Sequence, residues 1–229
     1  MISEGDSKKN YSDIALQYLR EQIIDGNMQP GEKLIESNIS EKLNLSRGPV
    51  RDALKQLAVE GLVDYHPNKG CTVALLSPRD AYEVFFLRGS LEKLALEKSG
   101  GHVDAYGILT MEAAMEEIKS LAGEDNILAE VKADEKFHAQ IVLSCQITRL
   151  YKMWELLSPL NGAMFLTLKN LRSRSDLDGS GMSRGDRLVN SHERILNAVK
   201  SGSLEESCKA LDAHYLKNGE IIYRSSLKA

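Results

Sequence analysis

Apolar residues recur three or four positions apart through the first 61 residues, and this spacing predicts amphipathic helices. The predicted helices follow a disordered start and cover residues 12–25, 38–43 and 47–60. Ser37 can cap the second helix, and Gly61 ends the third. Because only a tight turn separates these two helices, they are expected to form a helix-turn-helix.

Two short strands are predicted next, over residues 62–65 and 71–75, with turn-forming residues between them. A β-hairpin directly after a helix-turn-helix is a wing. Lys69 and Gly70 would lie at its protruding tip, where a cation and a residue without a side chain can approach nucleic acid closely.

The remainder of the chain has helical periodicity without convincing strand alternation. Ser77, Pro78 and Asp80 form a helix start, in which Ser77 is the N-cap. The predicted helices cover residues 79–98, 103–121, 125–144, 148–174, 186–200 and 204–225. The fourth helix should bend at Pro159, and a flexible loop is predicted over residues 176–185. We therefore predict a mainly α fold: an N-terminal winged helix-turn-helix over residues 1–76 and a C-terminal all-α antiparallel helical bundle over residues 77–229.

The third helix carries three cations on one side. Arg47, Arg51 and Lys55 are spaced four residues apart, which aligns them along the helix, and Ser46 can act as its N-cap. A solvated surface helix could show the same pattern if it stood alone. The preceding turn and the following wing favour a recognition helix for DNA.

Bulk composition narrows the class of protein. The chain has 229 residues, 42% of them hydrophobic, which is enough for two small domains. No apolar run approaches the roughly 20 residues that cross a bilayer, and the polar N-terminus lacks a signal-peptide pattern, so we expect a cytoplasmic protein with no membrane partner. Cys71, Cys145 and Cys208 form no CxxC pair, which argues against a disulfide framework. The net charge of -4 argues against nonspecific coating of DNA but is compatible with a local cationic footprint.

Several polar residues of the C-terminal region stand where the helical period requires apolar ones. They are one carboxylate and three imidazoles: Asp134, His138, His192 and His214. A single inward histidine is more often a core residue than a ligand. Buried ionisable groups are nevertheless costly unless paired or coordinated, and this set suits zinc, nickel, manganese or iron.

Arg88 is also predicted to point inward, and a buried guanidinium needs an anion. One candidate is an internal carboxylate such as Glu92. The other is the carboxylate of a small effector that also touches the metal.

The N-terminal motifs resemble the DNA-binding domain of the GntR family of bacterial transcription regulators. The similar segments are residues 30–34, 46–54, 60–63 and 68–70, together with Leu57. The resemblance implies that Arg47 and Arg51 read bases, that Ser46 touches phosphate and that Gly70 approaches the minor groove. Two residues depart from the family pattern: Gly48 replaces a usual Thr, and Ser37 stands where some members have a DNA-contacting Arg.

The C-terminal motifs resemble the FCD domain of FadR-type members of that family. The similar segments are residues 87–92, 134–138, 191–199 and 213–216. In metal-binding members the ligands match Asp134, His138, His192 and His214, and the arginine that matches Arg88 lines the effector pocket.

The leading hypothesis is a homodimeric, sequence-specific transcription regulator. It would act as a repressor that binds a near-palindromic operator in double-stranded DNA. Arg47 and Arg51 would reach bases, while Ser46, Lys55 and Lys69 would contact phosphates. A divalent metal, zinc first, and a small carboxylate or sugar-acid effector would control operator affinity.

Two alternatives remain open from the sequence. One is a metal-dependent enzyme fused to a DNA-binding module. This alternative is disfavoured because no further Glu or His on these helix faces could act as a general base. The other is a regulator in which the metal is purely structural. We expect a protein that is not an enzyme.

Overall fold

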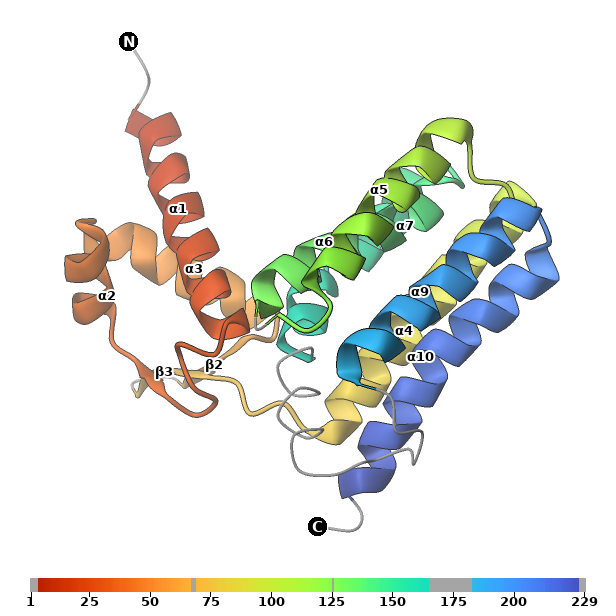
Figure 1. Cartoon of the computed structure of the whole chain (residues 1–229). Coiled ribbons are helices and arrows are strands. Elements are labelled where there is room, and N and C mark those ends of the chain that lie inside the picture. The colour runs from red at the N-terminus through yellow and green to blue at the C-terminus, as the bar shows by residue number, and fades with distance from the viewer. Residues whose placement is uncertain (1–3, 67–68, 125, 165–182, 227–229) are drawn as a thin grey trace. The chain divides into compact units, whose positions relative to one another are not determined.

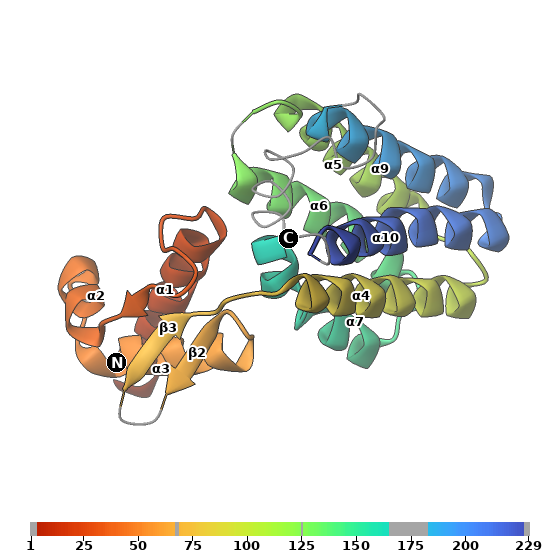
Figure 2. The ribbon, with the colours of Figure 1, turned by 90° about the horizontal axis from the view of Figure 1, so that it is seen from below.

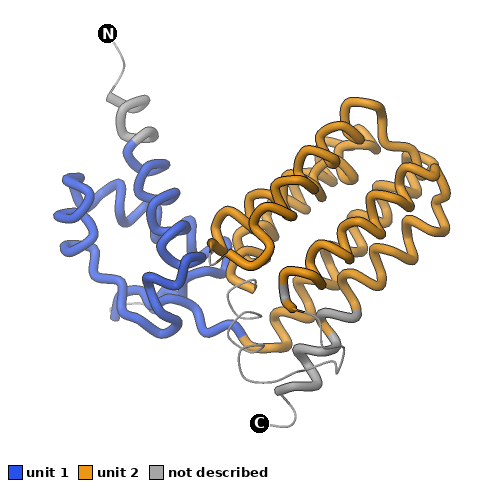
Figure 3. Tube along the Cα trace, viewed as in Figure 1, with its two compact units in different colours: residues 1–76 blue, residues 77–229 orange. Residues whose placement is uncertain are grey.

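The structure is a computed structural model that describes residues 4–66, 69–124, 126–164 and 183–226. The chain divides into two compact units, residues 1–76 and 77–229 (Figure 3). Among the described residues, no helix is both long enough and apolar enough to cross a membrane.

The first unit is a winged helix-turn-helix (Figure 2). Its elements are α1 (Glu4–Ile24), β1 (Lys33–Leu34), α2 (Glu36–Leu43), α3 (Arg47–Val59), β2 (Val63–His66) and β3 (Gly70–Val73). The strands form an antiparallel sheet in the order β1-β3-β2. Leu19 of α1 is fully buried together with Leu54 and Leu57 of α3, so the apolar faces that predicted these helices make the core of this unit.

Three details of this unit differ from the sequence prediction. α1 begins at Glu4, because a helix nucleated by its apolar residues can extend by one hydrogen bond per added residue through the polar start. α2 begins at Glu36 with Ile35 at its N-cap position, so Ser37 lies inside the first turn and is not the cap. β1 was not predicted because two residues are too few to show alternation; it pairs with β3 through Lys33 opposite Thr72 and Leu34 opposite Cys71.

The described residues of the second unit form helices and their connections without any strand, as predicted. Its elements are α4 (Pro78–Ser99), α5 (Ala105–Leu121), α6 (Ile127–Leu143), α7 (Thr148–Glu155), a helical stretch over residues 158–164, α9 (Arg184–Ser201) and α10 (Leu204–Ser226). Figures 1 and 2 show α4, α9 and α10 side by side, and α5 packs against α6. The mainly α fold class, with a winged helix-turn-helix and a helical bundle, is confirmed.

The start of α4 and the region of Pro159 test the local predictions. Ser77 and Asp80 form the predicted capping box, with the Asp80 amide donating to the Ser77 hydroxyl at 3.2 Å. The helix predicted over 148–174 is interrupted earlier than expected, at Leu156 and Leu157, and restarts at residue 158. Pro159 then occupies the first turn of the new stretch, where its missing N–H costs nothing. Residues 165–182, which include the end of that helix and most of the predicted loop, lie outside the described residues.

A pair of glycines after α4 allows a test of how closely the second unit is packed. Gly100 and Gly101 both have positive φ, of 67° and 80°. A Cβ atom at Gly101 would lie 3.1 Å from the Leu204 backbone, whereas one at Gly100 would meet nothing within 4 Å.

We therefore expect Gly100→Ala to lower the free energy of unfolding by about 1–2 kcal/mol through the left-handed backbone alone. Gly101→Ala should lower it by about 1–3 kcal/mol more, because the start of α10 would have to move. Urea unfolding followed by circular dichroism measures both values. Equal losses in the two variants would contradict the close approach of Leu204.

Candidate functional site

The recognition helix α3 separates apolar and cationic residues on two faces. Val50, Ala53, Leu54 and Leu57 are buried, whereas Arg47, Arg51 and Lys55 are exposed. Ser46 occupies the N-cap position with an extended backbone, but its hydroxyl makes no capping hydrogen bond, so the predicted capping contact was wrong. The N3 residue of this helix is Pro49, which lacks the N–H that a Ser cap would bind. The exposed Ser46 hydroxyl is thereby left available to another acceptor, such as a phosphate.

Two of the three cations on α3 have carboxylate partners that the sequence analysis did not anticipate. Glu36 of α2 accepts hydrogen bonds from Arg51, at 3.0 Å from Nε and 2.8 Å from Nη2. Lys55 lies 3.7 Å from the Asp52 carboxylate. At the wing, Lys69 and Gly70 are exposed, and Gly70 has a φ of 94° that favours glycine. All six residues that were predicted to contact DNA are therefore exposed on the first unit: Ser46, Arg47, Arg51, Lys55, Lys69 and Gly70. Their contacts with DNA stay predictions.

The four predicted metal ligands come together inside the second unit. Asp134 and His138 lie one turn apart on α6, His192 comes from α9 and His214 from α10. All four are buried, and one ligand atom from each lies within 4.8 Å of the others. Bonds of about 2.0–2.2 Å to a first-row metal place ligand atoms roughly 3–4 Å apart, so the cluster has nearly the dimensions of a metal site.

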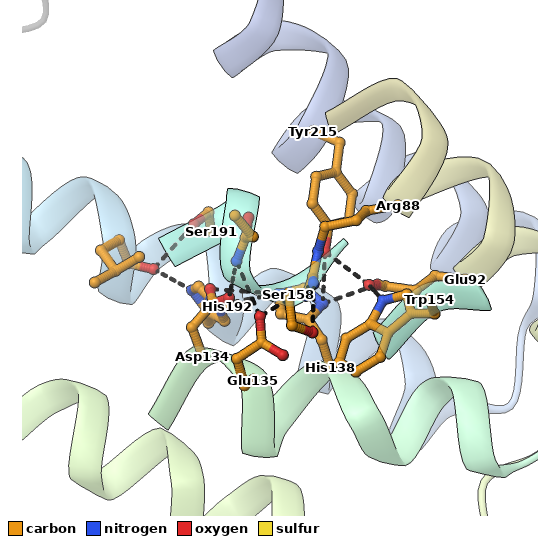
Figure 4. A network of polar contacts seen from close by, with 12 residues as sticks. Arg88, Glu92, Asp134, Glu135, His138, Trp154, Ser158, Ser191, His192 and Tyr215 are labelled. Atoms are coloured by element: carbon orange, nitrogen blue, oxygen red, sulfur yellow. Dashed lines mark hydrogen bonds and ion pairs between the residues drawn. The ribbon is translucent and has the colours of Figure 1, made fainter. Parts of the chain in front are cut away.

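Hydrogen bonds around the imidazoles determine which nitrogens face the centre of this cluster (Figure 4). The Nδ1 atom of His192 lies 2.8 Å from the Leu188 carbonyl oxygen, which can only accept, so Nδ1 carries the proton. The Nδ1 atom of His138 lies 2.8 Å from the Glu92 carboxylate, which favours a proton there too. Both Nε2 atoms are then lone-pair acceptors, and they lie 3.2 Å apart.

Asp134 adds a third acceptor at the same point. Its Oδ1 atom lies 3.1 Å from Nε2 of His192, while its Oδ2 atom accepts a hydrogen bond of 3.1 Å from Asn161. Burial would raise the pKa of Asp134, but the neighbouring His138 and His192 outweigh it, so the pKa is lowered and the carboxylate stays charged. Three converging acceptors repel one another unless a cation lies between them, so the residues present fit a metal ion.

The protonation of the surrounding groups agrees with this arrangement. Burial, His192 and His138 hold the pKa of His214 well below its usual value, so this imidazole is neutral, as a metal ligand must be. Burial would lower the pKa of His138, but Glu92 and Asp134 raise it, which means that the site attracts positive charge. That charge can be a proton on His138 or a metal ion.

Glu92 supports the cluster from behind, a role that the sequence analysis missed. Its fully buried carboxylate accepts hydrogen bonds from His138, from Trp154 Nε1 at 2.8 Å and from the Tyr215 hydroxyl at 2.7 Å. Burial and Glu92 raise the pKa of Tyr215, so that hydroxyl remains a donor. The available signal was that Glu92 follows Arg88 by one helical turn and therefore shares its inward face.

Arg88 is completely buried. The sequence analysis suggested an internal carboxylate such as Glu92 as its partner, but no hydrogen bond joins Arg88 to Glu92. Because three other donors already occupy Glu92, the Nη1 atom of Arg88 donates instead to Glu135 at 3.1 Å and to Ser158 at 3.3 Å. Its guanidinium lies over the Trp154 ring, 4.2 Å from the centroid. Nε and Nη2 have no hydrogen-bond partner among the described residues. The guanidinium thus keeps two donor nitrogens whose N–H groups a bound carboxylate could accept.

Each of the two units matches the sequence profile of a known family. The sequence profile of bacterial regulatory proteins of the gntR family matches residues 11–73. The profile of the FCD domain matches residues 83–217, more than half of the chain. Each matched range lies within one of the two compact units.

Curated relatives and solved structures agree with these matches. The uncharacterized HTH-type transcriptional regulator YdhC of Bacillus subtilis is 25% identical over 86% of this chain and 84% of its own length. The HTH-type transcriptional repressor GlaR of Escherichia coli is 32% identical over 61% of this chain and 65% of its own. A GntR regulator structure from Rhodococcus has a TM-score of 0.75 at 21% identity, covering 94% of this chain and 98% of its own, which shows a shared fold.

The relatives described here are transcription regulators, and none is an enzyme. The gntR family match covers the winged helix-turn-helix, and the FCD match covers the helical bundle that contains the acceptor cluster. This chain is therefore a DNA-binding transcription regulator that belongs to the GntR family and carries a C-terminal FCD domain.

Proposed function

We propose that this regulator is a repressor whose affinity for operator DNA is controlled by a small carboxylate bound beside a divalent metal in the helical unit. The observation that carries the proposal is the pairing of two features in one buried place. Three acceptor atoms of Asp134, His138 and His192 converge there, and two nitrogens of the nearby Arg88 have no hydrogen-bond partner among the described residues. A cation and an anionic group satisfy both features at once.

The metal would be held by Asp134, His138, His192 and His214, and zinc is the first candidate. Imidazole and carboxylate ligands also suit nickel, manganese and iron. The metal supplies positive charge that can attract an effector's carboxylate. Glu92 and the Leu188 carbonyl hold the two imidazoles in the required tautomer, as outer-shell partners commonly do.

The effector would be a small carboxylic or sugar acid. Its carboxylate would receive the Nε and Nη2 donors of Arg88, while Glu135 and Ser158 keep Nη1 in place. A relative from Bacillus licheniformis is named the gluconate operon transcriptional repressor, which supports this ligand class and the assignment as a repressor.

DNA recognition would use α3 and the wing. Arg47 and Arg51 would read base edges, Ser46, Lys55 and Lys69 would contact phosphates, and Gly70 would approach the minor groove. The regulator would act in the cytoplasm as a homodimer on a near-palindromic operator. Exposed apolar side chains on one side of α4 support self-association: Tyr82, Phe86, Leu87 and Leu94.

A purely structural metal is the second candidate. It is favoured by the full burial of His138 and His192, because an ion held there would link the three helices α6, α9 and α10. The two roles differ in one measurable respect: only a regulatory metal makes operator affinity depend on a carboxylate.

For the DNA interface, we expect Arg51→Ala to abolish the preference for operator over random DNA. A bidentate arginine contact with guanine contributes about 1–3 kcal/mol of discrimination at each half-site. Fluorescence anisotropy with an operator selected from a random duplex library measures both affinities. Equal retention of the preference in Arg51→Ala and in the wild type would remove Arg51 from base reading.

For the metal, we expect His192→Ala to lose stoichiometric zinc, and Glu92→Gln to bind zinc about 10- to 100-fold more weakly. Gln cannot hold the proton of His138 Nδ1 with a full negative charge. Competition with a chromogenic chelator measures the affinity, and His102→Ala is the control because His102 is exposed and remote from the cluster in sequence. If Glu92→Gln and His102→Ala bound zinc equally well, Glu92 would have no supporting role.

For the effector, we expect a carboxylic or sugar acid to raise the melting temperature of the zinc-loaded protein. Arg88→Met should weaken that ligand about 10- to 150-fold, because hydrogen bonds to a charged group are worth about 1.5–3 kcal/mol. The single tryptophan, Trp154, lies against Arg88, so its fluorescence should report the same binding event. The uncharged amide of the acid is the control ligand. Equal binding of acid and amide would contradict a carboxylate contact with Arg88.

A further inference from the structure

We infer that Glu36 is a positioning residue for base recognition, which holds one edge of the Arg51 guanidinium so that the opposite edge is presented to a guanine. The inference rests on the proposed role of Arg51 in reading bases and adds a specificity-determining residue on another helix. Glu36 belongs to α2, whereas Arg51 belongs to α3, and fifteen positions separate them in the chain.

The contact between the two side chains is side-on. The Glu36 carboxylate accepts from Nε of Arg51 at 3.0 and 3.2 Å and from Nη2 at 2.8 Å. No hydrogen bond joins Nη1 of Arg51 to another side chain in the part of the chain that the structure describes. Glu36 therefore occupies the Nε edge of the guanidinium and leaves the Nη1–Nη2 edge open.

The open edge is the one that guanine recognition can use. A guanidinium has five N–H donors in a planar fork, and two parallel donors match the O6 and N7 acceptors of guanine. Glu36 requires one N–H from Nε and one from Nη2, so Nη1 and the second N–H of Nη2 remain. One arginine can thus bind Glu36 and guanine at the same time.

The surroundings favour a held side chain over a mobile one. Arg51 is 56% exposed at its side chain and Glu36 31%, so the pair lies at the surface where DNA can reach it. The hydrogen bond from Arg51 lowers the pKa of Glu36, so the carboxylate is charged near neutral pH. The charged or titratable groups near this pair include Arg47, Lys55, Asp52, Tyr65 and Cys71. Without Glu36, the long Arg51 side chain would have to be ordered when DNA binds.

Pairing also lowers the attraction of α3 for any phosphate backbone. Glu36 partly neutralises Arg51, and a carboxylate close to the groove repels phosphates. This repulsion weakens binding to any duplex, so only the positioning of Arg51 changes the ratio of specific to nonspecific affinity. A residue that only stabilised the contact between α2 and α3 would change folding stability and leave base preference unaltered.

The test uses the full-length protein and a duplex selected by the wild type from a random library, with a scrambled duplex of equal composition as the nonspecific probe. The variants are Glu36→Gln, Arg51→Ala and the double variant, and Glu41→Gln is the matched control. Glu41 is an exposed acidic residue on the same helix, so its substitution also removes one negative charge without touching the bonds to Arg51. Anisotropy at about 0.15 M salt gives both affinities, and melting temperatures report the fold.

Glu36→Gln should reduce the preference for the selected duplex by about 2- to 12-fold per half-site, the range expected for ordering one long side chain on binding. Glu41→Gln should strengthen binding to both duplexes and keep their ratio. In the Arg51→Ala background, Glu36→Gln should have no further effect on the ratio, because Glu36 acts through Arg51.

The outcomes separate this inference from the proposed function. If Arg51→Ala keeps the preference, the base-reading role of Arg51 fails. If Arg51→Ala loses it but Glu36→Gln keeps it, Arg51 reads bases without the help of Glu36, and the inference alone is overturned. A higher preference in Glu36→Gln would mean that Glu36 competes with DNA for Arg51, which would also overturn it.

Discussion

The cost of removing charge from water is the constraint on which the helical unit depends. Arg88, Glu92, Asp134 and His138 are all within 2% of complete burial, and an unpaired buried charge would cost several kcal/mol. Their partners come from α6, α7, α9 and α10, so the bundle is held together by polar contacts as well as by apolar packing. The arrangement satisfies Glu92 fully but leaves converging acceptors at one end and unused donors on Arg88 at the other. The proposed metal and carboxylate would complete this network.

This network gives the proposed regulation a physical route. Arg88 and Glu92 lie one turn apart on α4, and Glu92 touches the imidazole of His138. A carboxylate bound to Arg88 would therefore act on α4 directly, and a metal bound to His138 would act on α4 through Glu92. That helix begins at Pro78, directly after the DNA-binding unit ends. If ligand binding favours one disposition of α4, operator DNA must favour or oppose the same disposition by an equal coupling free energy.

Most of the fold could be predicted because the spacing of apolar residues and the capping and turn residues indicate the same helices. Apolar spacing located the helices, and Ser77 with Asp80 marked the start of α4 to the residue. The buried set of Asp134 and three histidines could be found because each interrupts an apolar face. The partner of Arg88 could not be found, because the choice between Glu92 and Glu135 depends on which other donors reach Glu92 from distant helices. The Ser46 cap was wrong for a local reason: Pro49 removes the donor that a cap would bind.

The acidic balance of the chain is consistent with selective DNA binding once the pairing on α3 is considered. A net charge of -4 and carboxylate partners on Arg51 and Lys55 weaken the general attraction to phosphates. Under the proposed function, binding would depend on contacts that only the correct bases provide, and Arg51 would keep its carboxylate partner while it contacts guanine. Arg47 forms no ion pair with another described residue, so it provides the less constrained charge on the same helix face. With two paired cations and one that is unpaired among the described residues, α3 would gain discrimination at the expense of nonspecific affinity, in agreement with the proposed function.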